Sequence, residues 1–261
     1  MRQGKILLAQ QAVDVATTAT GITRLDDGRE VSSDVVQWLP PVSGTVFGVA
    51  LNDTGQRAAW NSRFYDAPYK TPPKTPVLFV KPANTHTGHN TAVALPEDGS
   101  PIQSGGALGV VIGQRARHIT AENAGQVIAG YTIVNELSLP EDSVYRPAIK
   151  AKCRDGFCPI GPLVTPAAAI TNPHGLEVRT YVNGELSGIA NTHDFLRPIG
   201  ELIAFISSFI TLNPGDLIIC GPAAPRIDLA AGDTVAIEID GLGRLENHIV
   251  ASPFATTGET A

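Results

Sequence analysis

The chain has few of the residues that mark secreted, membrane-spanning or nucleic-acid-binding proteins. Its 261 residues include only three cysteines, an odd number that is typical of a reducing compartment. No apolar run approaches the roughly 20 residues that a transmembrane helix needs, and no signal-peptide pattern opens the chain. The net charge of −6, without a basic stripe, argues against nucleic acid as a general partner. We therefore expect a cytoplasmic protein with neither membrane nor nucleic acid as a partner.

Aromatic residues are also scarce, at 6%, whereas glycine and proline number 26 and 20. This composition favours many turns and short strands over long helices, so we expect a mainly β (α+β) fold. Short apolar runs bounded by Gly, Pro, Asn or Asp predict strands over residues 46–51, 77–80, 108–112, 131–134, 178–182, 217–219 and 235–239. Asn183-Gly184 predicts a hairpin that joins residues 178–182 to residues 186–189.

Helices are expected at only three places, all of them peripheral. The clearest is residues 197–212, with Pro198 at its start and an apolar face that includes Phe209. Residues 120–129 begin with a threonine suited to an N-cap, and residues 53–65 form a weaker candidate. We predict a small N-terminal lobe over residues 1–43, with two or three strands and one helical turn, followed by a domain over residues 44–261.

The most informative stretch for function is residues 130–162. An apolar run ends in the acid Glu136, and a segment rich in Gly, Pro and Cys then carries basic residues that include Arg146 and Lys152. Positive side chains of this kind could hold the carboxylates of a small anionic molecule, while the acid could bind a metal or move a proton. The alternative from the residues alone is a surface loop whose charges are merely solvated.

The pattern around this stretch resembles the fumarylacetoacetate hydrolase superfamily. Residues 44–52 are similar to the family's opening strand, residues 77–82 to its Phe-x-Lys-Pro strand, and residues 211–221 to its late Thr-Leu-x-Pro-Gly-Asp strand. The resemblance covers nearly the whole chain and implies a mixed β-roll with few peripheral helices. Residues 69–74 and 150–161 are similar to the N-terminal half of bifunctional decarboxylase/isomerases of homoprotocatechuate (4-hydroxyphenylacetate) breakdown. The chain has the length of one such half with a short leader, which implies a free-standing subunit.

The resemblance implies a metal site that this chain has lost. The family holds one Mg²⁺ or Ca²⁺ with three acids, two of them in a Glu-x-Glu motif, and those two positions are Gly105 and Ala107 here. Only the third acid remains, as Glu136. A hard divalent cation needs several oxygen ligands. We therefore expect no tightly bound cofactor in this chain and Mg²⁺ in a partner subunit, and we expect that Gly105→Glu with Ala107→Glu would restore metal affinity.

Two further family positions are altered in the same direction. The base of the family's lid, a histidine, falls on Gln56, which cannot take a proton near neutral pH. The late Gly-Thr-Pro turn falls on residues 221–223, Gly-Pro-Ala, so its hydroxyl is absent. Several losses together indicate a chain that does not run the family's chemistry alone.

Three residues remain as site candidates. The resemblance implies that Lys152 faces a substrate carboxylate, with a surface pair to Glu141 or Asp155 as the alternative. Arg146 could clamp a second carboxylate or be an ordinary loop arginine. Glu136 and Lys152 are the candidate catalytic pair, although Glu136 could equally be a vestigial ligand or a structural acid. Lys81 is expected to pack its aliphatic stem along the sheet.

Three functional hypotheses follow from these residues. In the first, the chain is a subunit of the decarboxylase/isomerase that acts on 5-oxopent-3-ene-1,2,5-tricarboxylate and its decarboxylated product. It would pair with a homologous metal-bearing subunit, or form a homodimer when alone. The second hypothesis is a catalytically silent scaffold that keeps a carboxylate pocket around Lys152. The third is an independent, metal-free enzyme that uses Glu136 and Lys152 as acid and base.

Overall fold

The structure is a computed structural model that describes residues 1–18, 21–32, 36–144 and 147–254. Within these residues β-strands predominate over helices, as predicted. The strands are β1 (Gln3–Leu8), β2 (Gln11–Thr17), β3 (Ile22–Arg24), β4 (Glu30–Val31), β5 (Gln37–Leu39), β6 (Val46–Ala50), β7 (Val77–Lys81), β8 (His86–Thr87), β9 (Ala92–Ala94), β10 (Ile102–Ser104), β11 (Gly106–Ile112), β12 (Ile128–Asn135), β13 (Cys158–Pro159), β14 (Leu163–Pro166), β15 (Glu177–Val182), β16 (Glu185–Asn191), β17 (Leu217–Ile219), β18 (Ile227–Leu229), β19 (Thr234–Ile239) and β20 (Gly243–Val250).

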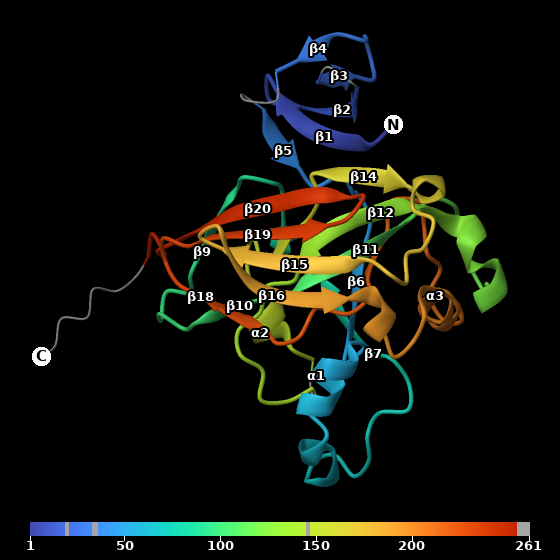
Figure 1. Ribbon diagram of the computed structural model, residues 1–261, viewed down its shortest axis with the longest axis vertical. Helices are drawn as coiled ribbons and strands as arrows, with labels where there is room; N and C mark the ends of the chain where they lie inside the picture. The colour runs from blue at the N-terminus through green and yellow to red at the C-terminus, as the bar shows by residue number, and fades with distance from the viewer. Residues whose placement is uncertain (19–20, 33–35, 145–146, 255–261) are drawn as a thin grey trace, which may run out of the picture.

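A large mixed sheet passes through the whole molecule, in the order β4-β3-β2-β1-β14-β12-β11-β17-β6-β7, with β5 paired to β1. Strands β11 and β12 lie at its centre, and β7 forms one edge. A second sheet, in the order β16-β15-β19-β20-β9, packs across the first (Figure 1). Most neighbours in both sheets are antiparallel, and in the described part of the chain no helix connects successive parallel strands in the manner of a doubly wound fold.

The predicted central strands are confirmed, and the hairpin is confirmed in its register. Strands β15 and β16 pair around Asn183 and Gly184, with Val182 opposite Glu185. Both turn residues have positive φ, 52° and 82°, which is the conformation that a two-residue hairpin of this type requires.

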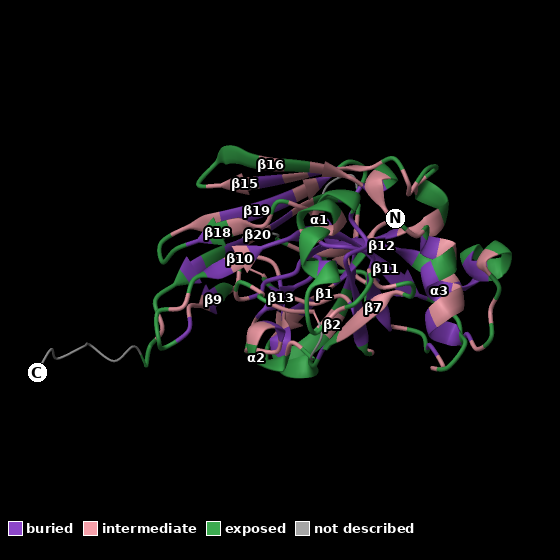
Figure 2. Cartoon of the chain, turned by 90° about the horizontal axis from the view of Figure 1, so that it is seen from below, coloured by how far each residue is buried: buried purple, intermediate pink, exposed green. Residues whose placement is uncertain are grey.

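The two faces of β11 bury different clusters, because successive side chains point to opposite sides of a strand. Leu108, Val110 and Ile112 pack into the main core against the second sheet. Ala107 and Val111 face a smaller cluster on the other side, which is completed by side chains of β6, β12, β13 and β17. Figure 2 shows this burial, with β11 and β12 in the interior and β16 exposed. A strand covered on both faces gives the continuous apolar run that the sequence displays.

The helices are shorter than predicted. Residues 120–129 do not form an α-helix: Ala121–Val127 is a 3₁₀-helix (η4), and Ile128 already begins β12. The Thr120 side chain makes no capping hydrogen bond, and Gly125 stands inside the segment. Glycine is a poor helix former, and the apolar residues that follow gain more by joining the central sheet.

The amphipathic helix predicted over residues 197–212 covers only Ile199–Ser207 (α3). The hydroxyls of Ser207 and Ser208 donate to the carbonyls of Ala204 and Phe205, a local bond that competes with the helical pattern. Phe209 therefore falls outside the helix and is 52% exposed, so its predicted place on the buried face was wrong.

The segment 53–65 divides into α1 (Thr54–Ala59) and the 3₁₀-helix η2 (Ser62–Tyr65). Asp53 caps α1, because its carboxylate accepts the backbone N–H of Gln56 at 2.8 Å. Three other 3₁₀-helices, η3 (Ala83–Thr85), η5 (Ala167–Ala169) and η6 (Thr192–Asp194), and the single turn α2 (Ile149–Lys152) complete the described helices. No helix among the described residues is long and apolar enough to cross a membrane.

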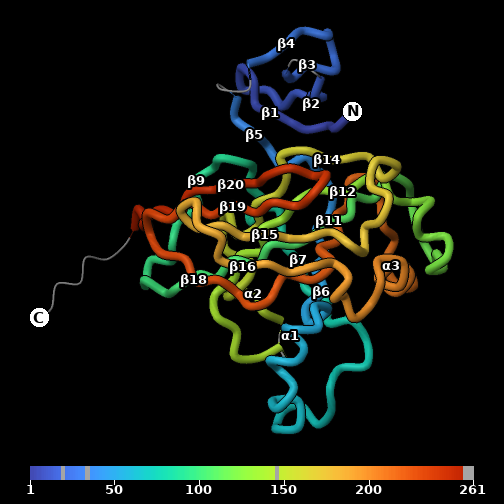
Figure 3. Tube along the Cα trace, in the orientation of Figure 1, coloured from blue at the N-terminus to red at the C-terminus, as the bar shows by residue number. Residues whose placement is uncertain are grey.

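The N-terminal residues contain more strands than predicted. Strands β1 to β5 lie there, and the described part of residues 1–43 contains no helix. Because residues 19–20 and 33–35 lie outside the described residues, the expected helical turn stays a prediction. Ile6, Val15, Ile22 and Trp38 form a separate small core. Figure 3 places these strands and the α1 region at opposite ends of the molecule. Since β1 continues the main sheet through β14, the division at residue 43 stays a prediction.

Candidate functional site

The two strands at the centre of the main sheet bring the predicted acid positions together. In the β11–β12 ladder Gly106 pairs with Asn135, and an isolated bridge joins Gln103 to Ser138. This register sets Gly105 opposite Glu136, whose backbone N–H donates to the Gly105 carbonyl at 2.9 Å. Partners in an antiparallel ladder share one face of the sheet, so a side chain at position 105 would lie beside Glu136.

Glu136 is completely buried and is surrounded by three cationic side chains. Lys81 Nζ lies 2.6 Å from its Oε1, and Lys152 Nζ lies 3.0 Å from its Oε2. Arg226 also pairs with Oε2 and donates through Nη1 to the Glu136 carbonyl at 2.6 Å. We call Glu136, Lys81, Lys152 and Arg226, together with Glu141, the Glu136 cluster.

The cations hold Glu136 in its ionised form. Burial by itself raises the pKa of the Glu136 carboxyl, but the nearby charges of Arg226, Lys152 and Lys81 outweigh it and keep the pKa well below its usual value. A carboxylate with so low a pKa is a weak base, since a general base needs a pKa near the working pH. These contacts favour a structural role for Glu136 over the catalytic role that the sequence suggested.

Lys81 is buried at the end of β7, and its ammonium group makes contacts that the sequence did not predict. Its ammonium group donates to the carbonyls of Leu137, Lys152 and Phe157 at 2.6, 2.8 and 2.9 Å, in addition to its pair with Glu136. Burial lowers the pKa of Lys81, and Glu136 partly offsets that effect. This one ammonium therefore ties β7 to three segments beyond β12.

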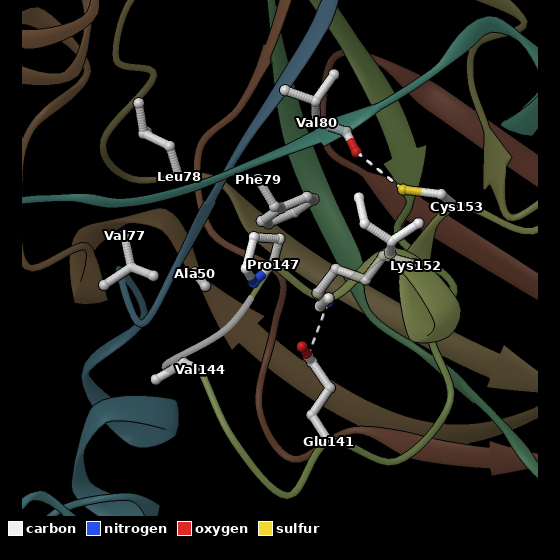
Figure 4. Close-up of a pocket in the computed structure, with 12 residues that line it drawn as sticks. Ala50, Val77, Leu78, Phe79, Val80, Glu141, Val144, Pro147, Lys152 and Cys153 are labelled. Carbon is white, nitrogen blue, oxygen red and sulfur yellow. Dashed lines mark hydrogen bonds and ion pairs between the residues drawn. The ribbon is translucent and has the colours of Figure 1, made fainter. Parts of the chain in front are cut away.

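Lys152 is buried, so the alternative of a surface lysine is wrong. Its ammonium pairs with Glu141 at 2.8 Å, as that alternative supposed, but it also reaches Glu136. A cavity of about 370 Å³ lies beside it, lined by apolar side chains of β7, Val144 and residues 147–149 (Figure 4). Lys152 Nζ stands 4.7 Å from the centre of the Phe79 ring in the same wall.

Gly48 makes room for that ring. A β-carbon on Gly48 would stand 2.0 Å from the Phe79 ring, so only glycine fits beneath it. The cavity therefore combines an apolar wall with one ammonium group and one carboxylate, Glu141. Arg146, the other predicted substrate contact, lies outside the described residues.

The residues present do not fit a divalent cation. Position 105 has no side chain, and Ala107 is buried among apolar neighbours. The one remaining acid, Glu136, faces three positive charges, whereas a hard cation needs several oxygen ligands. Among the described residues no three His, Cys, Asp or Glu side chains are grouped so as to hold a metal.

The two other altered positions have structural roles here. The Gln56 side chain accepts the backbone N–H of Leu51 at 2.7 Å and so supports that residue at a φ of +60°. After β17, the backbone N–H of Ala223 donates to the Gly106 carbonyl at 2.8 Å. The contact fixes the backbone three residues before Arg226, which immediately precedes β18.

The sequence interpretation missed Arg226 altogether. One signal was present: Arg226 is the only basic residue between Arg197 and Arg244, and it stands between a proline and a short apolar run. An isolated cation just before a strand could have been identified as a partner for a buried acid.

Comparison with known proteins agrees with this architecture. Residues 45–250 match the model of the fumarylacetoacetate (FAA) hydrolase C-terminal family. The chain is 43% identical, over 216 residues, to the 4-hydroxyphenylacetate degradation bifunctional isomerase/decarboxylase of Escherichia coli. That match covers 83% of this chain and 49% of the E. coli protein, so the chain spans about half the length of this relative.

Two solved structures are similar over nearly the whole chain. They are a 5-carboxymethyl-2-hydroxymuconate delta-isomerase from Mycobacterium smegmatis, with a TM-score of 0.83, and a 2-hydroxyhepta-2,4-diene-1,7-dioate isomerase from Mycobacterium marinum, with a TM-score of 0.80. Each is 30% identical, and each comparison covers 97% of this chain and 99% of the other. From its sequence match over residues 45–250 and its fold, the chain belongs to the fumarylacetoacetate hydrolase family.

Proposed function

We propose that this chain is one subunit of a decarboxylase/isomerase of 4-hydroxyphenylacetate breakdown. Its substrates would be 5-oxopent-3-ene-1,2,5-tricarboxylate and 2-hydroxyhepta-2,4-diene-1,7-dioate, and a homologous metal-bearing subunit would carry most or all of the catalysis. The observation that carries the proposal is the Glu136 cluster, which holds three cations where the family's chemistry needs acids around a metal. The similarity to half of a bifunctional isomerase/decarboxylase supports the choice of pathway.

In the family's chemistry a bound metal polarises the substrate carbonyl and stabilises the enolate that decarboxylation or proton transfer creates. This chain's own residues can contribute binding. The ammonium of Lys152 lies at the wall of the 370 Å³ cavity, where an anionic substrate group could replace the Glu141 carboxylate as its partner. The apolar walls suit the hydrocarbon part of a diene dicarboxylate.

A catalytically silent carboxylate-binding scaffold is the second candidate, and the same contact of Lys152 with the cavity favours it. The metal-free enzyme is less well supported, because Glu136 is held by three cations at a pKa too low for a base at neutral pH. Turnover by the wild-type chain alone separates the scaffold from the metal-free enzyme, since only the metal-free enzyme would be active without a partner.

The test is reconstitution. The chain, the metal-bearing homologue from the same organism and an equimolar mixture are each assayed for CO₂ release and for loss of diene absorbance, with Mg²⁺ and with EDTA. We expect activity from the mixture in Mg²⁺ and near-background activity from this chain alone. In the matched control, the homologue has one metal-binding Glu changed to Gln. Full turnover by this chain without partner or metal would overturn the proposal.

Assembly provides a second readout that does not depend on the substrate. In a bifunctional relative a covalent linker keeps the two homologous halves together. A free-standing half has to bind its partner subunit non-covalently at working concentrations. We therefore expect a dimer with the metal-bearing homologue after co-expression and a homodimer when the chain is alone. Native mass spectrometry distinguishes the two, and a chain that stays monomeric in the presence of the homologue would contradict the subunit role.

A further inference from the structure

Two strand ladders meet at Gly105 and bring Glu136 and Arg226 to its two sides. The β11–β12 register sets Glu136 opposite Gly105. On the other side β10 pairs with β18, with Ser104 opposite Ile227, so Arg226 is next in that register. The backbone alone therefore brings the side chain of Arg226 towards the position from which a carboxylate at residue 105 would start.

The side chain of Arg226 takes up that space. Its Nη1 lies 2.6 Å, and its Cζ 2.9 Å, from the point where a β-carbon on Gly105 would stand. The guanidinium is held there by Glu136 through two contacts, one to the carboxylate and one to the backbone carbonyl. A side chain at position 105 and the present position of Arg226 exclude each other.

The charges of the Glu136 cluster also disfavour a divalent cation while Arg226 is in place. Three cations (Lys81, Lys152 and Arg226) and two carboxylates (Glu136 and Glu141) sum to +1. A divalent cation would enter a region that is already positive and would have to displace a guanidinium from its carboxylate. With glutamates at positions 105 and 107 and no arginine at 226, the sum becomes four carboxylates against two lysines, or −2. A single divalent cation neutralises that charge.

We propose that Arg226 is an internal substitute for a divalent cation, and that its guanidinium blocks a latent metal site which opens only when acids at positions 105 and 107 are restored and Arg226 is removed. Restoring the two acids alone, which the sequence suggested would be enough, gives Arg226 new carboxylate partners instead of a metal site. The property belongs to this chain alone and is independent of any partner or substrate.

The test compares three purified proteins by calorimetric titration with Mn²⁺: the wild type, the double variant Gly105→Glu/Ala107→Glu, and the triple variant that adds Arg226→Ala. We expect no saturable site in the wild type. We expect one Mn²⁺ per chain in the triple variant, bound at least about tenfold more tightly than in the double variant, because the removed guanidinium is a like charge beside the cation. Adding Glu136→Gln to the triple variant should weaken this site, since Glu136 is the third carboxylate.

Equal Mn²⁺ affinity in the double and triple variants would overturn the proposal. A folded triple variant with no Mn²⁺ site would overturn it as well.

A second measurement decides the question if the triple variant does not fold. Arg226→Ala leaves Glu136 with a vacant space beside it that has the size of a guanidinium. We expect a lower thermal unfolding midpoint for this variant and partial recovery with millimolar methylguanidinium, whereas the wild type and the exposed-site control Arg115→Ala should not respond. An Arg226→Ala chain as stable as the wild type, or one that methylguanidinium does not stabilise, would show that no cation is needed there and would overturn the proposal.

Discussion

Arg226 lies in the space that a side chain at position 105 would need, because its Nη1 stands 2.6 Å from the site of a β-carbon on Gly105. A side chain at position 105 and the present position of this arginine therefore exclude each other. The guanidinium places a positive charge beside Glu136, so the buried carboxylate has a third cationic partner besides Lys81 and Lys152.

Gly105→Ala should destabilise the protein by about 1–3 kcal/mol, since the added methyl group displaces the guanidinium. The loss should be smaller when the same change is made in an Arg226→Ala background, and a double-mutant cycle from urea unfolding measures this coupling. Gly125→Ala is the matched control, because a β-carbon there meets no atom within 4 Å. Equal losses in both backgrounds would show that the two residues are not coupled.

Lys81→Met should cost about 3–5 kcal/mol of unfolding free energy, because it leaves Glu136 and three carbonyl groups without their shared ammonium partner. The exposed Lys70→Met is the control and should change stability by less than about 0.5 kcal/mol. Urea unfolding at pH 7 measures both. A Lys81→Met chain close to wild-type stability would mean that the buried ammonium contributes little.

The Glu136 carboxyl should stay ionised far into acid. Its pKa is depressed in the folded chain by Arg226, Lys152 and Lys81, so it contributes stability above its unfolded pKa of about 4.3 and loses that contribution as the pH falls towards the folded value. Below about pH 4 the unfolded chain binds the extra proton. Stability should then fall with acid, by up to about 1.4 kcal/mol per pH unit from this group.

Carbon-13 NMR of the glutamate carboxyls measures this titration directly. We expect the Glu136 resonance to show no midpoint between pH 7 and pH 3. A Glu136 midpoint near 4.3 would mean that the three cations do not stabilise its charge in solution.

The wild-type chain should show no saturable Mg²⁺ binding at micromolar concentration, and EDTA should leave its thermal midpoint unchanged. The reason is that one carboxylate surrounded by three cations offers a divalent ion no net attraction. Calorimetry and a thermal scan of the same sample measure the two effects. A stoichiometric site that disappears in Glu136→Gln would contradict this expectation.

Cys153 should react with a thiol reagent in the folded chain, whereas Cys158 and Cys220 should react only after unfolding. Burial raises the pKa of Cys158 to about 12 and also raises the pKa of Cys220, so neither forms a thiolate at neutral pH. Cys153 is partly exposed and lies at the cavity wall. Counting thiols with Ellman's reagent, before and after denaturation, measures the difference. More than one fast thiol in the folded protein would contradict the buried positions.

The sequence by itself determined the central strands and the position of Glu136 at the end of one of them. Residues 217–219 were predicted with the bounds that the structure gives, because a strand buried on both faces must be apolar throughout and must stop at polar or turn residues. Asn183-Gly184 fixed a hairpin, since both residues accept positive φ. Glu136 was predicted to lie directly after a central strand, because the apolar run of that strand stops just before it. The helix bounds were less predictable. Serine hydroxyls bond to the backbone carbonyls at the end of α3, and Ile128 joins the central sheet instead of extending η4.

Only the tertiary structure decided which charges meet. Lys81, Lys152 and Arg226 come from three separate segments, and the local patterns around the two lysines do not indicate a buried ion pair with Glu136. The desolvation cost of burying a lysine is offset only where a carboxylate and several carbonyls converge on it, and the order of the strands sets that convergence. The sequence identified the acid Glu136, and the sheet register brought Arg226 beside it.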